Sequence, residues 1–381
     1  MRAVLVDRIR RQGRISFADF MELVLYHPQL GYYNTAEEKI GPSGDYYTSP
    51  SVHPIFGGLI ACQLNQMWEI LGSPSPFFII EGGAGKGLLC LDILNRAEES
   101  FPLFFENSRY ILSDQSPWMT AKQKTLLKDF AASAKVQWMS LQDLLGQPEK
   151  WIGCFLSNEL IDSLPVHRVQ QQGGRLREVF LSRKGSSFSE TLDEPSSPAL
   201  AAYLQSYGCP LQEGQRAEIN LQALNLLEDV YRFLDRGFAF TIDYGFEARE
   251  LYDPSRPDGT LLSYFRHTAS SDLYKRIGFQ DITAHVNFTA LMRKGEEMGL
   301  KNLGFTEQYK FLLALGLLKE MEEYEKKSPF YSSAEFLKNK LAMKNFLIPG
   351  GMGTLFKVLV QGKGVGSPNL SGFNDPLPRG G

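Results

Sequence analysis

The strongest constraint on this chain is an alternation of short apolar runs and amphipathic stretches through its middle. Five apolar runs predict strands, at residues 77–81, 110–114, 136–138, 154–157 and 238–243. Residues 88–97 and 118–130, between the first of these runs, have helical apolar spacing. Strands that alternate with helices are joined by right-handed crossovers and form a parallel sheet that is covered on both faces. We therefore predict an α/β fold with a doubly wound, Rossmann-like sheet.

The rest of the chain predicts additions to this core. Ser16 followed by Asp19 resembles a capping box that begins a helix, and a long loop rich in Gly, Tyr and Ser precedes Pro50. The predicted parts are N-terminal helices with a lid loop (1–74), the first part of the core (75–167), a strand-rich insertion (168–217), the second part of the core (218–286), a helical insertion that could dock a substrate (287–348), the final core strand (349–362) and a disordered tail (363–381).

A glycine-rich turn, Glu81–Gly87, joins the first predicted strand to its helix. Glycines let a backbone turn tightly and approach a ligand, and ligands of doubly wound sheets bind at the carboxyl ends of the strands. A pyrophosphate-binding turn would need glycine in place of Leu88, and a P-loop would need Ser or Thr in place of Gly87. The E/D-x-G-x-G-x-G turn of S-adenosylmethionine enzymes is matched by Glu81, Gly83, Gly85 and Gly87. A carboxylate favours that cationic cofactor and repels phosphate, although a turn without any ligand stays an alternative.

Polar residues at other strand ends agree with this site. Asp114 ends the second strand, where a carboxylate can accept both ribose hydroxyls, as it also does in NAD enzymes. Asn158 follows the fourth strand at the same edge, where it could equally cap a helix. Thr48 lies in the predicted lid loop beside two tyrosines, which could instead simply pack on the surface. The predicted contacts of S-adenosylmethionine are Glu81, Gly82, Gly83, Ala84, Gly85, Gly87, Asp114, Asn158 and Thr48.

Composition excludes several other classes of protein. The net charge of −3 argues against a protein that coats nucleic acid or anionic membrane, so we predict neither partner. The longest apolar stretch, Phe311–Leu318, is far shorter than the roughly 20 residues that cross a bilayer. The four cysteines are widely spaced without histidine pairs, which predicts free thiols in a reducing compartment and no metal site. We expect the cytoplasm, or the mitochondrial matrix if the source is a eukaryote.

An ordered set of motifs resembles the MidA-like family of S-adenosylmethionine-dependent methyltransferases. The motifs cover nearly the whole chain, and they are Ile15-Ser-Phe, Gly31-Tyr-Tyr33, Gly44-Asp45, Thr48-Ser-Pro50, Phe56-Gly57, Glu81–Gly87, Asp114-Gln-Ser-Pro117, Asn158-Glu159, Asp162-Ser-Leu-Pro-Val166, Asp243-Tyr-Gly245, Asp281–Phe288, Thr306 with Gln308, Pro349–Gly353 and Phe356-Lys-Val-Leu359. The chain departs from the family's usual residues at Ser51 and Gly58, where Glu is common, and at Asn287, where Asp is usual. If those acids orient the substrate, the target differs here.

The resemblance implies methylation of a protein arginine, and in mitochondrial members of an arginine in a core subunit of respiratory complex I. A protonated guanidinium is a poor nucleophile, so a pair of carboxylates would bind it in a fixed geometry and accept its proton. We predict that Glu159 and Asp162 form this pair, facing one side if their turn is helical, with Asp45 and Asp243 as substitutes. The alternatives are a non-catalytic assembly chaperone that binds S-adenosylmethionine and, less favoured, an NAD(P)-linked oxidoreductase.

Overall fold

A computed structural model describes residues 1–36, 39–41, 44–148, 150–185, 187–327, 333–348 and 352–375. The chain divides into two compact units. The core unit comprises residues 47–159, 229–244 and 295–381, and the second unit comprises 1–46, 160–228 and 245–294. Three elements begin in one unit and end in the other, and they are α11 (Leu221–Phe233), β10 (Leu234–Phe246) and α13 (Phe288–Met298).

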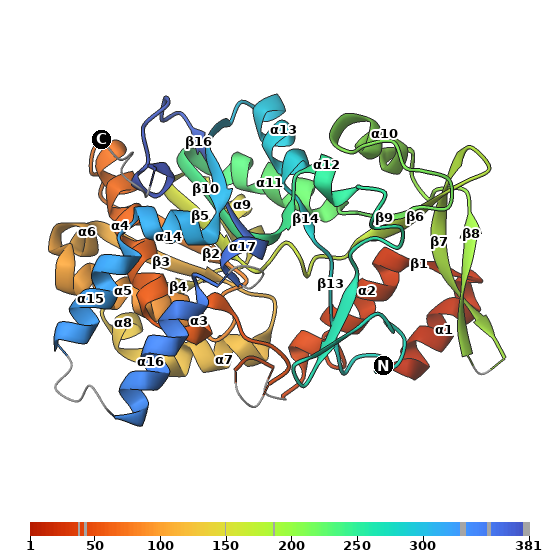
Figure 1. Ribbon diagram of the computed structural model, residues 1–381, viewed down its shortest axis with the longest axis horizontal. Coiled ribbons are helices and arrows are strands. Elements are labelled where there is room, and N and C mark those ends of the chain that lie inside the picture. Colours follow the sequence, from red (N-terminus) through yellow and green to blue (C-terminus); the bar gives the residue numbers. More distant parts are fainter. Residues whose placement is uncertain are drawn as a thin grey trace. The chain divides into compact units, whose positions relative to one another are not determined.

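The core unit contains the predicted parallel sheet (Figure 1). Its strands are β2 (Phe77–Gly82), β3 (Ser108–Ser113), β4 (Val136–Trp138), β5 (Trp151–Asn158), most of β10, β15 (Lys301–Glu307) and β16 (Phe356–Lys363). They lie in the order β15-β16-β10-β5-β2-β3-β4, and the five strands from β10 to β4 are parallel. The chain order reverses between β2 and β5, which makes their carboxyl ends the topological switch point where ligands bind. The predicted fold class is confirmed.

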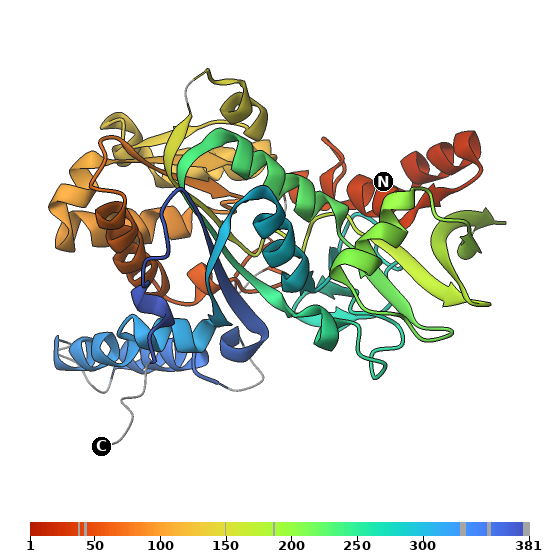
Figure 2. The ribbon, with the colours of Figure 1, turned by 90° about the horizontal axis from the view of Figure 1, so that it is seen from above.

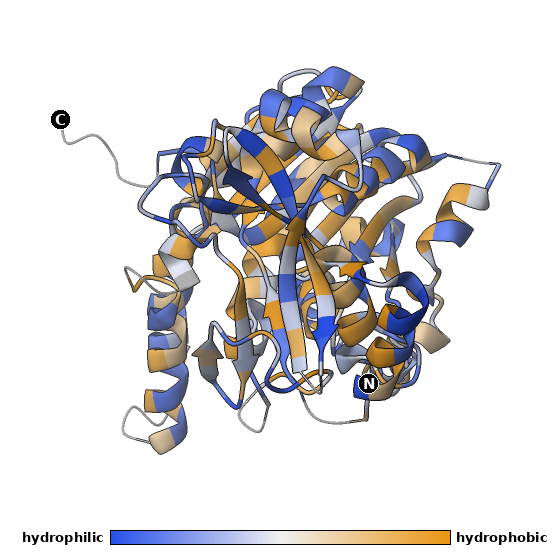
Figure 3. Ribbon diagram, turned by 90° about the vertical axis from the view of Figure 1, so that its right-hand side faces the viewer, coloured by the Kyte–Doolittle hydropathy of each residue, from blue (hydrophilic) through white to orange (hydrophobic). Residues whose placement is uncertain are grey.

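The core unit also contains a set of helices. They are α3 (Ser49–Val52), α4 (Ile55–Ile70), α5 (Leu88–Ser100), α6 (Pro102–Asn107), α7 (Pro117–Leu126), α8 (Lys128–Ala132), α9 (Leu141–Gly146), α14 (Gln308–Ala314), α15 (Leu317–Lys327), α16 (Ala334–Asn345), α17 (Met352–Leu355) and the 3-10 turn η2 (Ser371–Phe373). Many helices carry hydrophobic and hydrophilic residues along one ribbon (Figure 3), as amphipathic packing requires. Helices α15 and α16 lie side by side (Figure 2), with the rings of Tyr324 and Phe336 stacked at 5.6 Å.

The second unit is built on antiparallel sheets. One sheet has the order β1-β7-β6-β9 with β8 paired to β7, and a smaller one has the order β12-β11-β13. The elements are α1 (Arg2–Gln12), β1 (Ile15–Ser16), α2 (Phe17–Tyr26), η1 (Tyr32–Asn34), β6 (His167–Gln172), β7 (Arg175–Lys184), β8 (Ser187–Asp193), α10 (Pro198–Tyr207), β9 (Arg216–Ile219), α12 (Ala248–Leu251), β11 (Leu262–Phe265), β12 (Thr268–Ser270), β13 (Asp281–Thr283) and β14 (Val286–Asn287). The predicted capping box at Ser16 and Asp19 begins α2.

Several predicted boundaries are wrong. The N-terminal part ends at Tyr46, because the buried face of α4 belongs to the core cluster of the core unit. Residues 245–286, predicted as core, belong to the second unit, where Leu261, Leu273 and Ile282 pack with Phe17 and Phe20 of the N-terminal segment.

Two predictions near the C-terminus also need correction. The predicted helical insertion contains β15, a half-buried strand of the main sheet, so this segment is not an addition to the core. The predicted disordered tail is ordered as far as residue 375: Leu370 is 1% exposed, and Phe373 packs on Phe311 with ring centroids 5.2 Å apart. Residues 376–381, and Pro349–Gly351 of the predicted motif, lie outside the described residues.

Candidate cofactor and active site

The glycine turn lies at the carboxyl end of β2, at the topological switch point where ligands bind in folds of this class. Gly83, Gly85 and Gly87 have positive φ angles of 67°, 53° and 82°. Other L-residues pay about 1–2 kcal/mol in this left-handed region, so the backbone path favours glycine at these positions. The Gly83 amide donates to the Ser113 carbonyl at the end of β3 (2.9 Å), and Gly87 directly precedes α5. The turn therefore joins the ends of two neighbouring strands.

Gln123 of α7 holds this turn in place, a role that the sequence analysis missed. The side chain is fully buried, and its Nε2 donates to the Gly85 carbonyl (2.8 Å) and to Asp114 Oδ2 (3.1 Å). Its Oε1 accepts a hydrogen bond from Trp138 Nε1 (3.0 Å). One side chain thus fixes the turn relative to the predicted ribose-binding carboxylate. No sequence motif marks Gln123, because its position matters only once α7 packs beside the turn.

Glu81 is buried in β2 and not exposed at the surface of the site. It is 3% exposed, and its Oε2 accepts a hydrogen bond from the Tyr110 hydroxyl (2.6 Å). Burial raises the pKa of Glu81 to about 8; the Tyr110 hydrogen bond opposes this shift, and the charge of Asp114 adds to it. A nearby cation would compensate this desolvated carboxylate, which fits the chemistry predicted for the position.

Asp114 and Asn158 lie at the ends of β3 and β5, as predicted. Asp114 Oδ1 accepts from the Ser116 amide (2.8 Å), and burial raises the pKa of its carboxyl. Asn158 is 8% exposed, and within the described part of the chain its buried Oδ1 accepts no hydrogen bond, nor does the buried Oγ of neighbouring Ser157. Buried polar atoms are rarely left unsatisfied, so these oxygens fit a bound ligand with donor groups. Acceptor groups and a glycine cradle together suit the ammonium, sulfonium and ribose of S-adenosylmethionine.

Glu159 follows β5 in a strained conformation that the sequence did not predict. Its φ is +53°, so the turn to Asp162 is not the helical one on which the predicted pairing depended. The Glu159 Oε1 accepts hydrogen bonds from the Ser49 amide (2.9 Å) and from Asn158 Nδ2 (3.0 Å). Left-handed non-glycine residues cluster at functional sites. The two hydrogen bonds fix the Glu159 carboxylate beside Asn158, a predicted contact of the cofactor.

The start of α3 is held at the same place in the core unit. The Ser49 hydroxyl lies 3.3 Å from Gln308 Oε1, and Gln308 is fully buried at the start of α14. Thr48 precedes α3, and its amide donates to Ser51 Oγ (2.9 Å). Ser51, where the family usually has Glu, thus serves the local cap of α3. Ser49 and Gln308 are positioning residues. Both belong to the family motifs, but the sequence did not indicate that their side chains meet.

Asp162 and Asp45 belong to the second unit, in which both are buried. Asp45 accepts hydrogen bonds from the Tyr32 hydroxyl (2.7 Å) and the Arg266 amide (2.7 Å). Burial raises the pKa of Tyr26; the hydrogen bond with Ser163 opposes this shift, and the charges of Asp281 and Asp162 add to it. Because Asp45 accepts hydrogen bonds from Tyr32 and Arg266, its carboxylate holds its own loop in place.

Asp243 and Asn287, the other residues in question, have structural partners. Asp243 is fully buried in β10, and its Oδ1 accepts from the Tyr244 amide (2.9 Å). Asn287 Oδ1 accepts from the Ala290 amide (3.1 Å) in the first turn of α13, and its Nδ2 donates to the Tyr207 carbonyl (3.1 Å). Asn287 therefore caps α13, and its amide group also holds the Tyr207 carbonyl.

Comparisons with known proteins agree with this geometry. The sequence profile of a family described as S-adenosyl-L-methionine-dependent methyltransferases (Methyltransf_28) matches residues 59–306. The mitochondrial protein arginine methyltransferase NDUFAF7 homolog of Drosophila melanogaster is 28% identical over 96% of this chain and 85% of its own length. Human protein arginine methyltransferase NDUFAF7 is 27% identical over 82% of this chain and 72% of its own. A crystal structure from Burkholderia thailandensis with bound S-adenosylhomocysteine is 31% identical, with a TM-score of 0.87 over 98% of this chain and 94% of that one.

The doubly wound sheet and the family profile are those of an S-adenosylmethionine-dependent methyltransferase. The chain belongs to the Methyltransf_28 family of these enzymes. The predicted enzyme class and cofactor are confirmed, and the NAD(P)-linked alternative is set aside.

Proposed function

We propose that this methyltransferase modifies an arginine side chain of a protein substrate. The relatives that match along most of the chain are named protein arginine methyltransferases, which supports this substrate class. The structural observation that carries the proposal is the fixed carboxylate of Glu159, directly after the strand that bears Asn158, a predicted contact of the cofactor.

The chemistry of the residue to be methylated explains why a carboxylate is needed. S-adenosylmethionine supplies a methyl group bonded to a positively charged sulfur. An arginine nitrogen gains an N–CH3 bond in place of one N–H bond, so the site has to accept one proton. A carboxylate binds the planar guanidinium through charge-assisted hydrogen bonds, orients one nitrogen and favours loss of that proton. We assign this role to Glu159, whose orientation is fixed by the Ser49 amide and the Asn158 amide group. Asp162, the other predicted carboxylate, belongs to the second unit, so the proposal is carried by Glu159 alone.

The substrate and the compartment extend the proposal. An arginine of a core subunit of respiratory complex I is the first target to test, on the resemblance described above. No helix in the described part of the chain combines the length and the hydrophobicity of a membrane span. We place the protein in the cytoplasm, or in the mitochondrial matrix of a eukaryote; the Drosophila and human relatives are mitochondrial by name.

Transfer of labelled methyl groups tests the proposal. The protein is incubated with tritiated S-adenosylmethionine and an extract that contains complex I subunits, and labelled proteins are hydrolysed to amino acids. We expect methylarginine, and we expect Glu159→Gln to lower the rate at least a hundredfold while S-adenosylhomocysteine still binds, because glutamine keeps the Oε1 acceptor and removes the charge. Label in nucleic acid, or in lysine, would contradict the substrate class. Cofactor binding without any transfer would favour the non-catalytic chaperone.

A further inference from the structure

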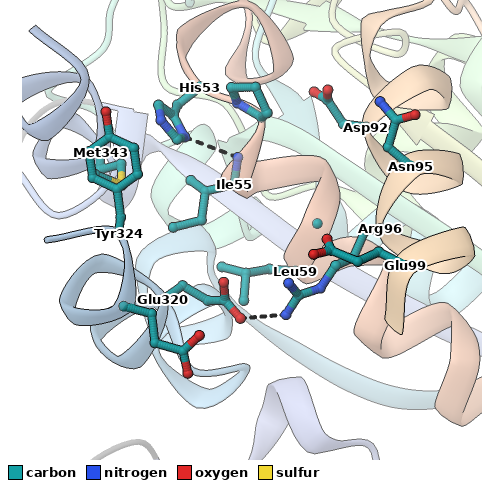
Figure 4. A pocket seen from close by; sticks show the side chains of 13 residues that line it. His53, Ile55, Leu59, Asp92, Asn95, Arg96, Glu99, Glu320, Tyr324 and Met343 are labelled. Carbon is teal, nitrogen blue, oxygen red and sulfur yellow. Dashed lines mark hydrogen bonds and ion pairs between the residues drawn. The ribbon is translucent and has the colours of Figure 1, made fainter. Parts of the chain in front are cut away.

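The core unit contains a cavity that shares no residue with the glycine-turn site. Its volume is about 300 Å³, and it lies among α4, α5, α15 and α16 (Figure 4). The lining residues are His53, Pro54, Ile55, Gly58, Leu59, Asp92, Asn95, Arg96, Glu99, Glu320, Glu323, Tyr324 and Met343. This volume is at the lower end of small-ligand sites, and a single long side chain fits such a space.

The walls of the cavity carry an excess of negative charge. Four carboxylates line it, those of Asp92, Glu99, Glu320 and Glu323, against one guanidinium, that of Arg96. Arg96 pairs with Glu320, as the dashed line in Figure 4 shows. His53 adds no positive charge, because burial lowers the pKa of its ring. The lining of the cavity therefore carries more negative than positive charge, and a bound cation would reduce this imbalance.

Asp92 is the carboxylate that most needs this countercharge. Within the described residues it makes no hydrogen bond or ion pair, although it is only partly exposed on α5. Burial raises the pKa of Asp92 to about 7. An acid that is desolvated by the walls of a cavity, without a protein partner, is a group that a bound cation would stabilise in its charged form.

The two adjacent glycines of α4 differ in what packs against them. A Cβ at Gly57 would lie 2.5 Å from the Asp92 Cβ, so close packing of α4 on α5 requires glycine there. A Cβ at Gly58 would meet no atom nearer than the Arg96 Cγ at 3.8 Å, so no packing requires it. Glycine inside a helix weakens it, and one use of such a position is close approach of a ligand to the backbone. Gly58 leaves the α4 backbone open to the cavity.

The remaining lining suits an aliphatic stem below a charged head. Ile55, Leu59 and Met343 provide an apolar floor. The rings of His53 and Tyr324 stand edge to face, with centroids 5.9 Å apart. Lysine and arginine side chains bury their methylene stems on apolar surface and keep the cation near carboxylates and aromatic faces. We propose that this cavity binds a lysine or arginine side chain of a partner protein. The inference rests on the proposed function in one respect, namely that the cation belongs to a protein.

The methyl signal of Met343 provides a direct test. The protein has ten methionines, so selective methyl-13C labelling gives a small set of NMR signals, and Met343→Leu identifies the one that reports on the cavity. The probe is N-acetyl-lysine amide, and N-acetyl-norleucine amide is its uncharged counterpart. We expect the Met343 signal to shift saturably with the first compound and to stay unchanged with the second.

Matched variants connect this binding to the cavity. Asp92→Asn should weaken it at least fivefold and Gly58→Leu, which fills the cavity, should abolish it, whereas Glu98→Gln, an exposed neighbour on α5 outside the lining, should leave it unchanged. Unfolding midpoints and S-adenosylhomocysteine affinity show whether each variant is folded. An unmoved Met343 signal, equal response to the norleucine compound, or unchanged binding in Gly58→Leu would overturn the inference. Binding without arginine methylation would overturn only the proposed function.

Discussion

At the scale of single residues, the site depends on backbone geometry that only a few side chains tolerate. The glycine turn was predictable from the sequence because its glycines lie within one short segment and follow an acidic strand end. Gln123 was not predictable, since its two contacts bridge residues that are 38 and 9 positions away. The left-handed turn at Glu159 was also hidden, because glutamate gives no signal for that conformation.

Gly85→Val tests the glycine turn. We expect loss of measurable S-adenosylhomocysteine binding by calorimetry, because a β-branched residue cannot adopt the positive φ of Gly85 without moving the turn. Gly72→Val is the matched control, since Gly72 also has a positive φ (83°) but no atom within 4 Å of its Cβ position, and it precedes the amino end of β2, whereas the glycine turn follows the carboxyl end. Both variants should lose about 1–2 kcal/mol of stability. Equal affinity in the two variants would refute the assignment of the turn.

Gln123→Leu tests the positioning role of this side chain. The variant loses both hydrogen bonds to the site and leaves Trp138 Nε1 unpaired, so we expect KM for S-adenosylmethionine to rise about tenfold, on the order of 1.4 kcal/mol, with a smaller change in kcat. Gln63→Leu is the control, because Gln63 is equally buried and holds the Gly372 amide instead. The same rise of KM in both variants would mean that Gln123 acts only through general stability.

The raised pKa of Glu81 predicts a specific pH dependence. The folded protein holds the proton of this carboxyl up to about pH 8, whereas the unfolded chain releases it near 4.5. The contribution of this protonated carboxyl to the free energy of unfolding is therefore complete below about pH 4.5. It is lost as the pH rises towards 8, by roughly 1.4 kcal/mol per pH unit at most. Urea unfolding of wild type and Glu81→Gln from pH 5 to pH 8 should show a steeper loss in the wild type. Parallel curves would contradict this ionisation.

At the scale of elements, the strongest patterns were correct and the half-buried ones were missed. The buried strands read as continuous apolar runs, so β2, β3, β5 and β10 were predicted close to their observed positions. Strand β15 escaped prediction because its exposure is intermediate along nearly all of its length and Gly304 interrupts it. The C-terminal segment was assigned to disorder on composition, although Leu370 and Phe373 pack with the main core cluster.

Leu370→Ala tests this anchor. Leu370 is 1% exposed in the main core cluster, so its truncation should cost about 2–5 kcal/mol in urea unfolding. Leu341→Ala is the control, because Leu341 is 63% exposed and its loss should change stability by less than about 0.5 kcal/mol. An equally small effect of Leu370→Ala would mean that the segment is disordered, as the sequence predicted.

At the scale of the whole molecule, the sequence order of the parts concealed how they assemble. Each unit is assembled from three separate segments, and the chain passes between the units directly after Glu159 and directly after Tyr244. Linear boundaries drawn from composition could not show this interleaving. The cofactor assignment was unaffected, because Glu81–Gly87, Asp114, Asn158 and Thr48 all belong to the core unit.

A crystal structure with S-adenosylhomocysteine bound would show whether the cofactor lies on the glycine turn. We predict the ligand against Gly83–Gly87, with its ribose hydroxyls on Asp114 and its ammonium group within about 3.2 Å of the unsatisfied Asn158 Oδ1. A ligand held elsewhere in the chain, with that oxygen still unpaired and the turn in contact with nothing, would contradict the account.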